Sequence, residues 1–218
     1  MNASRSIVHG ILLSGALLSA VQAAGESTKL TFEQAPLGAL PPGWTAAHTG
    51  SGTGSAWKVV EDRSAPGGAK VLAQTSSSGH HRFFNLCVAD ATRFLNPEIR
   101  VAFKPLAGKE DQGGGLVWRY QDADNYYIAR MNPLEHNFRV YKVVHGVRIQ
   151  LGTAKAEARA GDWHTLRVVA SGERIQAFLD GKPYLDVKDD AFRSAGKIGF
   201  WTKADAQTEF ANLEITGP

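Results

Sequence analysis

Hydrophobic and polar residues alternate along the chain in short segments, and the helical spacing of hydrophobic residues is almost absent. Alternation with a period of two is typical of half-buried β-strands. Gly, Pro, Asn and Asp separate the segments, as expected for turns between antiparallel strands. The pattern predicts fourteen strands, at residues 29–33, 56–62, 69–74, 82–88, 98–105, 114–120, 125–132, 137–144, 147–152, 163–171, 174–180, 182–187, 197–203 and 208–216.

The number of strands and the turn sequences together predict the fold class. Gly146 follows His145 and Gly181 follows Asp180, and such dipeptides suit tight hairpins because glycine readily takes a positive φ. Residues 36–55 are rich in Gly, Pro, Ser and Thr and are expected to form a long loop. We therefore predict an all-β domain, a sandwich or jelly roll of two packed antiparallel sheets.

The beginning of the chain predicts a secretory signal peptide at residues 1–23. Arg5 precedes an apolar run over residues 7–21 that is too short to span a bilayer, and small residues surround the expected cleavage site after Ala23. The protein is therefore expected in the periplasm or outside the cell. Residues 24–218 are expected to form a single domain, by their length.

Composition narrows the classes of function. The chain has 24 Lys and Arg residues against 21 Asp and Glu. Loss of Arg5 with the signal peptide leaves a net charge of about +2, too small to indicate a nucleic-acid binder. No second hydrophobic run predicts a membrane span. Cys87 is the only cysteine, so no internal disulfide can form. Electrostatic recognition therefore has to be local, and the oligomeric state is left open.

The stretch from Asn125 to Tyr141, NYYIARMNPLEHNFRVY, predicts a hairpin centred on the PLEH turn. This centring places Arg130 directly opposite Arg139, although like charges in opposed positions destabilise a sheet. One face of the hairpin is apolar and is expected to meet the core, while the other is polar and aromatic. The two arginines are therefore predicted to point away from the core.

The same alternation extends the polar face to the neighbouring strands. Arg119 is expected opposite Tyr126, and the next hairpin is expected to place Arg148 and Gln150 on the same side. The predicted ligand-binding face contains Arg119, Tyr126, Arg130, Asn132, Asn137, Arg139, Tyr141, Arg148 and Gln150.

Such a face suits a poly- or oligosaccharide. Tyrosine rings stack on the apolar faces of sugars, amide groups match hydroxyls, and guanidinium groups bind carboxylates or sulfates through paired hydrogen bonds. An acidic saccharide would also relieve the repulsion between Arg130 and Arg139. The alternative is that these arginines simply alternate outward into water, as on any half-solvated antiparallel sheet.

Several runs of the sequence resemble a known group of proteins. They include GGLVWRYQDADNYYIARMN, GDWHTLRVVASGERIQAFLDGKPYLDV and GKIGFWTKADAQTEFANLEI. These runs are similar to the concanavalin-A-like jelly roll of laminin-G-like and 3-keto-disaccharide hydrolase (3-keto-glucoside lyase/hydratase) domains in exported bacterial proteins, and the resemblance covers nearly the whole mature chain. It implies a concanavalin-A-like β-sandwich, a fold that carries lectins, glycosidases, lyases and binding modules.

The chain also departs from the pattern of this group. The Glu-x-Asp-x-x-Glu cluster of laminarinase-type members is missing, which argues against a retaining hydrolase of that type. A structural calcium is the one cofactor that the resemblance raises, held by Glu33 and by an Asp that many relatives have before the last strand. This chain has Ala211 at that place, which removes one of the implied ligands.

His136 and Glu135 are the catalytic candidates, because a histidine beside a carboxylate at the rim of the polar face can move protons near neutral pH. The alternative is that His136 is merely exposed in its turn. Three functions are left open. The preferred one is an exported saccharide-binding or accessory protein. The others are a glycan-processing enzyme of the 3-keto-disaccharide hydrolase or lyase kind, and a structural envelope protein without a ligand.

Overall fold

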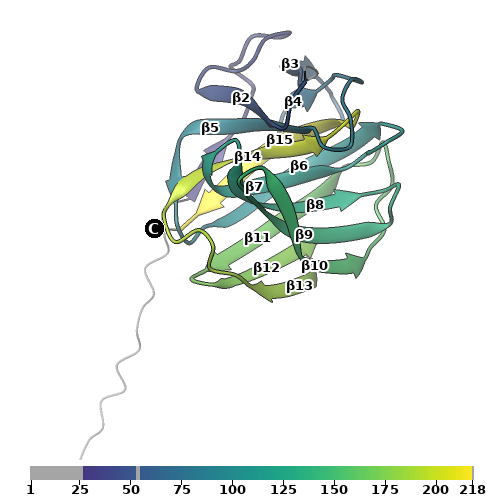
Figure 1. Ribbon diagram of the computed structural model, residues 1–218. Helices are drawn as coiled ribbons and strands as arrows, with labels where there is room; N and C mark the ends of the chain where they lie inside the picture. Colours follow the sequence, from purple (N-terminus) through teal and green to yellow (C-terminus); the bar gives the residue numbers. More distant parts are fainter. Residues whose placement is uncertain (1–26, 53–54, 218) are drawn as a thin grey trace, which may run out of the picture.

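The computed structural model describes residues 27–52 and 55–217, and within them every regular element is a β-strand (Figure 1). The strands form two antiparallel sheets, which confirms the predicted fold class. The signal peptide predicted at residues 1–23 lies outside the described residues. In the described part of the chain, no helix has the length and apolar character needed to cross a membrane.

Sheet A has the strand order β13-β12-β11-β6-β15-β4-β3, and β1 pairs with β15 at one side. Its strands are β1 (Ser27–Leu30), β3 (Trp57–Glu61), β4 (Lys70–Gln74), β6 (Glu98–Ala107), β11 (His164–Ser171), β12 (Arg174–Leu179), β13 (Lys182–Lys188) and β15 (Gln207–Thr216).

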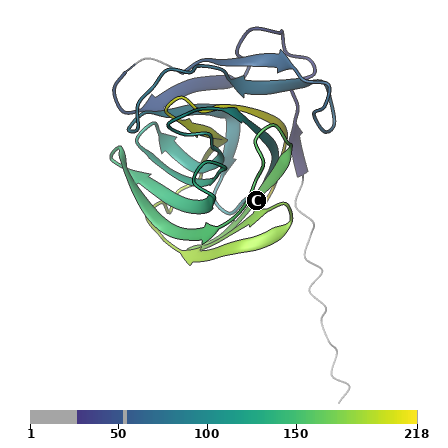
Figure 2. The ribbon, with the colours of Figure 1, turned by 90° about the vertical axis from the view of Figure 1, so that its right-hand side faces the viewer.

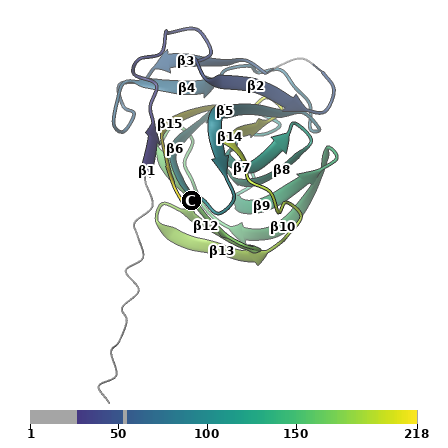
Figure 3. The same cartoon turned by 90° about the vertical axis from the view of Figure 1, so that its left-hand side faces the viewer.

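Sheet B has the order β10-β9-β8-β7-β14-β5-β2. Its strands are β2 (Trp44–Thr49), β5 (Phe84–Phe94), β7 (Gly114–Asp122), β8 (Asn125–Asn132), β9 (Asn137–Val144), β10 (Val147–Lys155) and β14 (Gly196–Lys203). Figure 2 shows both sheets curling around the domain, and in Figure 3 β2, β3 and β4 lie together at the top.

The main core fills the space between the two sheets. Phe200 of sheet B stacks on Phe210 of sheet A, with ring centroids 4.4 Å apart and planes 3° from parallel. Trp118 stacks on Tyr127 at 5.4 Å, and Cys87 is buried in the same cluster. Burial of each large apolar side chain contributes about 1.5–3 kcal/mol, so this layer stabilises the sandwich without any disulfide.

Strand β2 corrects the prediction of a continuous loop over residues 36–55. Trp44 is buried and stacks on Phe200 at 5.1 Å, and His48 stacks on Phe83 at 5.0 Å. The segment also pairs with β5 along its whole length. Glycine and proline on both sides of this short strand hid it in the sequence, whereas pairing with a neighbouring strand defines it.

Sheet B curves so strongly that side chains on its outer face converge. The guanidinium carbon of Arg148 on β10 lies 4.9 Å from the ring centroid of Phe84 on β5, although four strands separate β10 from β5. Thr49 on β2 forms a 2.6 Å hydrogen bond with the hydroxyl of Tyr126 on β8. The face of sheet B that points away from sheet A is therefore concave.

Candidate functional site

The predicted register of the three strands β8, β9 and β10 is confirmed. Arg130 pairs with Arg139, and Asn132 pairs with Asn137. Arg148 pairs with Val143 on the other side of β9. Alternation then places the arginines on the concave face, because Met131, Phe138 and Val140 belong to the core between the sheets.

A single carboxylate oxygen joins the two opposed arginines. Oε2 of Glu135 accepts hydrogen bonds from Arg130 Nη2 at 2.9 Å, from Arg139 Nη1 at 3.0 Å and from Asn137 Nδ2 at 3.1 Å. Burial on its own raises the pKa of Glu135, but the charge and hydrogen bond of Arg130 outweigh burial and lower that pKa to about 2. The carboxylate is therefore ionised and offsets part of the repulsion between the arginines.

Tyr141 on β9 contacts the same two arginines through its hydroxyl group. Its hydroxyl oxygen accepts hydrogen bonds from Arg130 Nη2 at 3.3 Å and from Arg139 Nη1 at 3.2 Å. The guanidinium of Arg148 covers the Tyr141 ring, 4.5 Å from its centroid, and also approaches Trp201 at 5.7 Å. Cation–π contacts of this kind hold an arginine in place without consuming its hydrogen-bond donors.

Asp111 and Lys203 belong to the same site, and neither was predicted from the sequence. Asp111 lies in the loop before β7 and is fully buried, with Oδ1 accepting a hydrogen bond from the backbone N–H of Gly113 at 2.8 Å. Its Oδ2 atom is 3.5 Å from Lys203 Nζ. Burial raises the pKa of Asp111 despite the opposing charges of Arg130 and Lys203. Lys203 lies two residues after Trp201 on β14, and this spacing is the sequence signal that places both side chains on the same face of the strand.

We call this set of side chains the concave cluster. Its members lie on four strands of sheet B, in the β6–β7 loop and in the β8–β9 turn, and are polar or aromatic: Asp111, Arg130, Asn132, Glu135, Asn137, Arg139, Tyr141, Arg148 and Lys203.

Four buried polar atoms of the concave cluster have no hydrogen-bond partner among the described residues. They are Asp111 Oδ2, Arg130 Nε, Asn132 Nδ2 and Arg148 Nη1. Buried polar groups in proteins are nearly always hydrogen-bonded, and an unpaired group marks a place for water or a ligand. Three of these atoms are donors and one is an acceptor.

The concave cluster also carries surplus positive charge. It contains four cations, on Arg130, Arg139, Arg148 and Lys203, and two carboxyl groups, on Asp111 and Glu135. Four minus two leaves at least two unbalanced positive charges. The raised pKa of Asp111 can only increase this surplus. The site therefore favours anionic groups over cationic ones.

Gly115 explains how Arg130 fits against β7. A methyl group at Gly115 would lie 2.8 Å from the Ala129 carbonyl oxygen and 2.9 Å from Arg130 Cβ. Contacts that short require the neighbouring strand to move, so glycine is needed for the close approach of β8.

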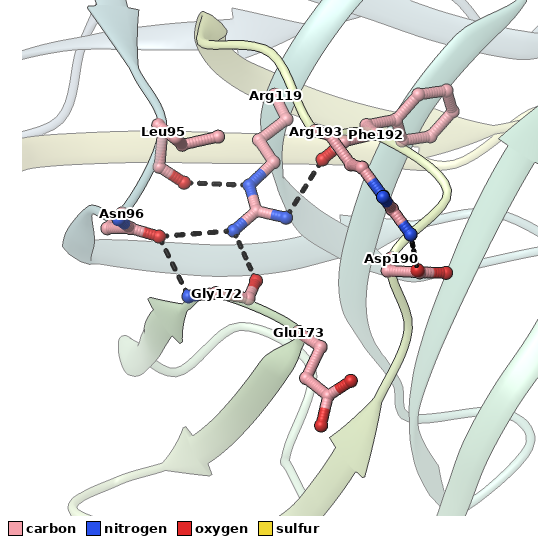
Figure 4. Close-up of a pocket in the computed structure, with 8 residues that line it drawn as sticks. All are labelled: Leu95, Asn96, Arg119, Gly172, Glu173, Asp190, Phe192 and Arg193. Carbon is pink, nitrogen blue, oxygen red and sulfur yellow. Dashed lines mark hydrogen bonds and ion pairs between the residues drawn. The ribbon is translucent and has the colours of Figure 1, made fainter.

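Arg119 does not lie on the concave face, so its predicted placement was wrong. A shift in strand pairing between Trp118 and Asp122 interrupts β7, and Arg119 takes a φ of 47° there. Its guanidinium donates hydrogen bonds to the carbonyl oxygens of Leu95 at 2.7 Å, Gly172 at 2.7 Å and Phe192 at 3.0 Å (Figure 4). Strict alternation fails at such a bulge, and the side chain turns to the opposite side of the sheet.

The three carbonyl groups belong to three separate connections, β5–β6, β11–β12 and β13–β14. Arg119 therefore ties these connections together, at the wall of a cavity of about 340 Å3. The remaining charged side chains at this cavity are paired: Arg193 contacts Asp190, and Glu173 accepts a 2.8 Å hydrogen bond from Lys188. This arrangement identifies Arg119 as a structural residue.

Two other predicted residues lie on the concave side at its margins. Tyr126 is fully buried there, and its hydroxyl is bonded to Thr49. Gln150 on β10 is exposed and pairs with Tyr141 in the predicted register. Tyr126 therefore belongs to the buried apolar part of this face, and Gln150 lies on the edge strand of sheet B.

His136 and Glu135 do not act together in this geometry. The His136 ring is 61% exposed, and its Nδ1 atom lies 2.7 Å from Oε2 of the exposed Glu157. Glu135 instead binds the two arginines, and a carboxylate with a pKa of about 2 is a weak general base near neutral pH.

The surroundings of Glu33 do not fit the calcium site that the resemblance implied. Glu33 Oε1 accepts a 2.8 Å hydrogen bond from the backbone N–H of Lys70, and the Lys70 ammonium group binds the Ala35 carbonyl at 2.8 Å. The described residues contain no group of three or more His, Cys, Asp or Glu side chains able to hold a metal ion. A calcium ion would here meet one carboxylate and a nearby ammonium group.

Solved structures share this fold at low sequence identity. The carbohydrate-binding module CBM66 from Bacillus subtilis has a TM-score of 0.64 at 20% identity, over 80% of this chain and 96% of that chain. The exoplasmic domain of VIP36, in its Ca2+/Man-bound form, has a TM-score of 0.59 at 14% identity, over 86% and 88%. The carbohydrate recognition domain of Emp47p has 0.56 at 12% identity, over 87% and 94%. These likenesses establish the sandwich fold.

Sequence comparison gives the family. None of the curated proteins matches the chain. A family model described as a 3-keto-alpha-glucoside-1,2-lyase-like domain matches residues 40–216, which is most of the 218-residue chain. This match confirms the resemblance of its strand and turn sequences to 3-keto-disaccharide hydrolase domains. The chain therefore belongs to the family of 3-keto-alpha-glucoside-1,2-lyase-like domains.

Proposed function

We propose that this protein binds a saccharide on the concave face of sheet B. The proposal is carried by the four buried polar atoms of the concave cluster that have no hydrogen-bond partner among the described residues. A sugar hydroxyl both donates and accepts hydrogen bonds, so neighbouring hydroxyls can satisfy donors and acceptors together. An unsatisfied buried group costs about 1–3 kcal/mol, and a ligand that pairs with it recovers that free energy on binding.

The accessible rim of the cluster is where the saccharide would first make contact. The side chains of Arg139 and Glu135 are 29% and 35% exposed, whereas that of Arg130 is only 1% exposed. Arg148 covers the Tyr141 ring. A ligand that displaces Arg148 from the Tyr141 ring, at the cost of this cation–π contact, would uncover an aromatic face on which a sugar ring can stack.

The names of the structural relatives support the same proposal. CBM66 is a carbohydrate-binding module, and the Emp47p domain is a carbohydrate recognition domain. Because a shared fold does not by itself imply a shared function, the unpaired atoms of this chain's own concave cluster remain the main support.

Binding can be tested with residues 24–218 on a glycan array, followed by calorimetry with the sugars that bind. Arg139→Gln and Arg148→Gln should each weaken binding about tenfold, because charge-assisted hydrogen bonds are among the stronger polar contacts. Arg174→Gln is the matched control, since Arg174 is exposed on β12 and pairs with Asp186. Absence of any bound glycan, or equal weakening in the Arg174 variant, would contradict the proposal.

Family membership favours a second function, cleavage of a 3-keto-glucoside. In that reaction a base takes the proton from C2 beside the ketone, the C1–O bond breaks, a C1=C2 double bond forms, and the departing oxygen takes up a proton. We propose Asp111 as the base, because its Oδ2 atom has no hydrogen-bond partner among the described residues, lies 3.5 Å from Lys203 Nζ, and belongs to a carboxyl group whose pKa is raised by burial. Arg130 and Lys203 would stabilise the charge that develops on the ketone oxygen.

The elimination product is a conjugated enone, which absorbs ultraviolet light. Incubation with 3-keto-glucosides should therefore produce an absorbance increase, and Asp111→Asn should abolish it. Asp190→Asn, a change at the exposed pair with Arg193, should leave the rate unaltered. A folded wild-type protein that gives no product with this panel would exclude the second function and leave saccharide binding as the proposal.

A further inference from the structure

The position between Arg130 and Arg139 is already occupied by a carboxylate of the protein itself. Glu135 Oε2 receives one hydrogen bond from each guanidinium and a third from Asn137 Nδ2, all between 2.9 and 3.1 Å. Guanidinium groups prefer carboxylate partners in this range of distances. Glu135 thus occupies the place that a ligand's carboxylate would take.

Glu135 differs from its partners in its freedom to move. It belongs to the turn between β8 and β9, and its side chain is 35% exposed. Leu134 beside it is 47% exposed, so this part of the turn packs against little else. Arg130 is held on its strand at 1% exposure, with Tyr141 and Asn137 as further partners. Rotation of Glu135 into solvent would therefore vacate the position while the two arginines keep their places.

Vacating this position is unfavourable unless another anion fills it. Without Glu135 the concave cluster would hold four cations and a single carboxyl group, on Asp111. A buried arginine that loses its charged partner is strongly destabilised, whereas a replacement carboxylate restores the same contacts. A neutral hydroxyl can accept hydrogen bonds but cannot balance the charge.

We propose that Glu135 is an intramolecular competitor for a carboxylate of the ligand, and that the saccharide bound on the concave face contains uronic acid. This inference rests on the proposed saccharide-binding function and names the substrate class of the same site. The ligand carboxylate binds Arg130 and Arg139, and Glu135 turns outward into water. The strong acidity of Glu135, with its pKa of about 2, keeps the competitor charged across the ordinary pH range.

The test compares uronate oligosaccharides with their own methyl esters, which keep the sugar and remove the charge. Glucuronate, galacturonate and mannuronate oligomers are titrated into wild-type protein, Glu135→Gln and Glu157→Gln. The Glu135 variant removes the competing charge but keeps an amide oxygen that can still accept from the arginines. Glu157 is the control, because it is exposed at the same end of the domain and pairs with His136. Circular dichroism and thermal melting establish that each variant is folded.

We expect the wild type to bind at least one acid more tightly than its ester, and Glu135→Gln to bind that acid about tenfold more tightly again while the ester changes little. Glu157→Gln should match the wild type. Equal or weaker binding of the acid by folded Glu135→Gln overturns the inference. Binding of a methyl ester as tightly as its acid overturns the inference while leaving the proposed function in place. If the acids and the esters do not bind, and no sugar on the glycan array binds either, both the inference and the proposed function are wrong.

Discussion

Arg130 and Arg139 occupy directly opposed positions on β8 and β9, and one oxygen of Glu135 lies within 3.0 Å of a guanidinium nitrogen of each. Opposed like charges are unfavourable in a sheet, so the pair persists because the turn that joins the two strands supplies the balancing carboxylate. The same relationship places an accessible anion at the rim of the proposed binding site.

The first prediction concerns Arg119 as a structural residue. Arg119→Met should lower the free energy of unfolding by about 3 kcal/mol or more, because the carbonyl groups of Leu95, Gly172 and Phe192 lose their buried donor. Urea denaturation followed by tryptophan fluorescence measures the change. Arg193→Met, at the rim of the same cavity, is the control: its side chain is 81% exposed, and a change below about 0.5 kcal/mol is expected. Similar small losses in both variants would contradict the structural role.

The second prediction concerns the ion pair between Asp62, which directly follows β3, and Lys104 on β6, on the outer face of sheet A. Burial raises the pKa of Asp62, but hydrogen bonds from Lys104 and Ser64 outweigh it and hold that pKa well below the usual 3.8. A carboxyl group whose pKa is lower in the folded protein than in the unfolded chain stabilises the folded protein at pH values above its pKa in the unfolded chain. This contribution is lost as the pH falls towards the pKa in the folded protein. Asp62→Asn should therefore cost about 1–2 kcal/mol near neutral pH.

The difference in the free energy of unfolding between the wild type and Asp62→Asn should shrink as the pH falls below 3.8. Urea denaturation curves collected across the acid range measure it. Asp190→Asn, an exposed change, should show no comparable loss near neutral pH. A difference that stays constant into strong acid would show that Asp62 acts through something other than its charge.

The third prediction concerns the acidity of Glu135. Its carboxyl carbon, followed by nuclear magnetic resonance, should titrate with a pKa of about 2, so the stability contributed by this carboxylate is present above 4.5 and lost as the pH falls towards 2. Arg139→Gln should raise that pKa by removing one of the two guanidinium partners. Arg174→Gln, a change outside the concave cluster, should leave the pKa of Glu135 unchanged. A wild-type pKa of Glu135 near the usual 4.5 would contradict the described geometry.

The fourth prediction concerns Cys87. Burial raises the pKa of this thiol and removes it from solvent, so it should be inert in the folded protein. Reaction with a thiol reagent should be on the order of a hundredfold slower in the native protein than in denaturant, because the thiolate is the reactive form. Rapid modification of the native protein would mean that the core opens at β5 more readily than its packing implies.

The sequence allowed the hairpin register to be predicted because regular strands alternate with a fixed period. With the turn centred on PLEH, the residue numbers alone give the positions of Arg130, Asn137 and Tyr141 relative to one another. The same counting failed at Arg119, since the shift in pairing after Trp118 breaks the period. Nothing in the residues around Arg119 distinguishes that bulge from a continuous strand.

The sequence by itself determined the all-β class, most of the strands and which residues share a face, because these depend on local alternation and on turn residues. Only the tertiary structure decided that Asp111 and Lys203 join the arginines, because a loop and a distant strand reach the site through the curvature of sheet B. It also separated His136 from Glu135 and gave the arginine pair its carboxylate. Such contacts depend on how side chains converge in three dimensions, and the order of residues along one strand does not contain that information.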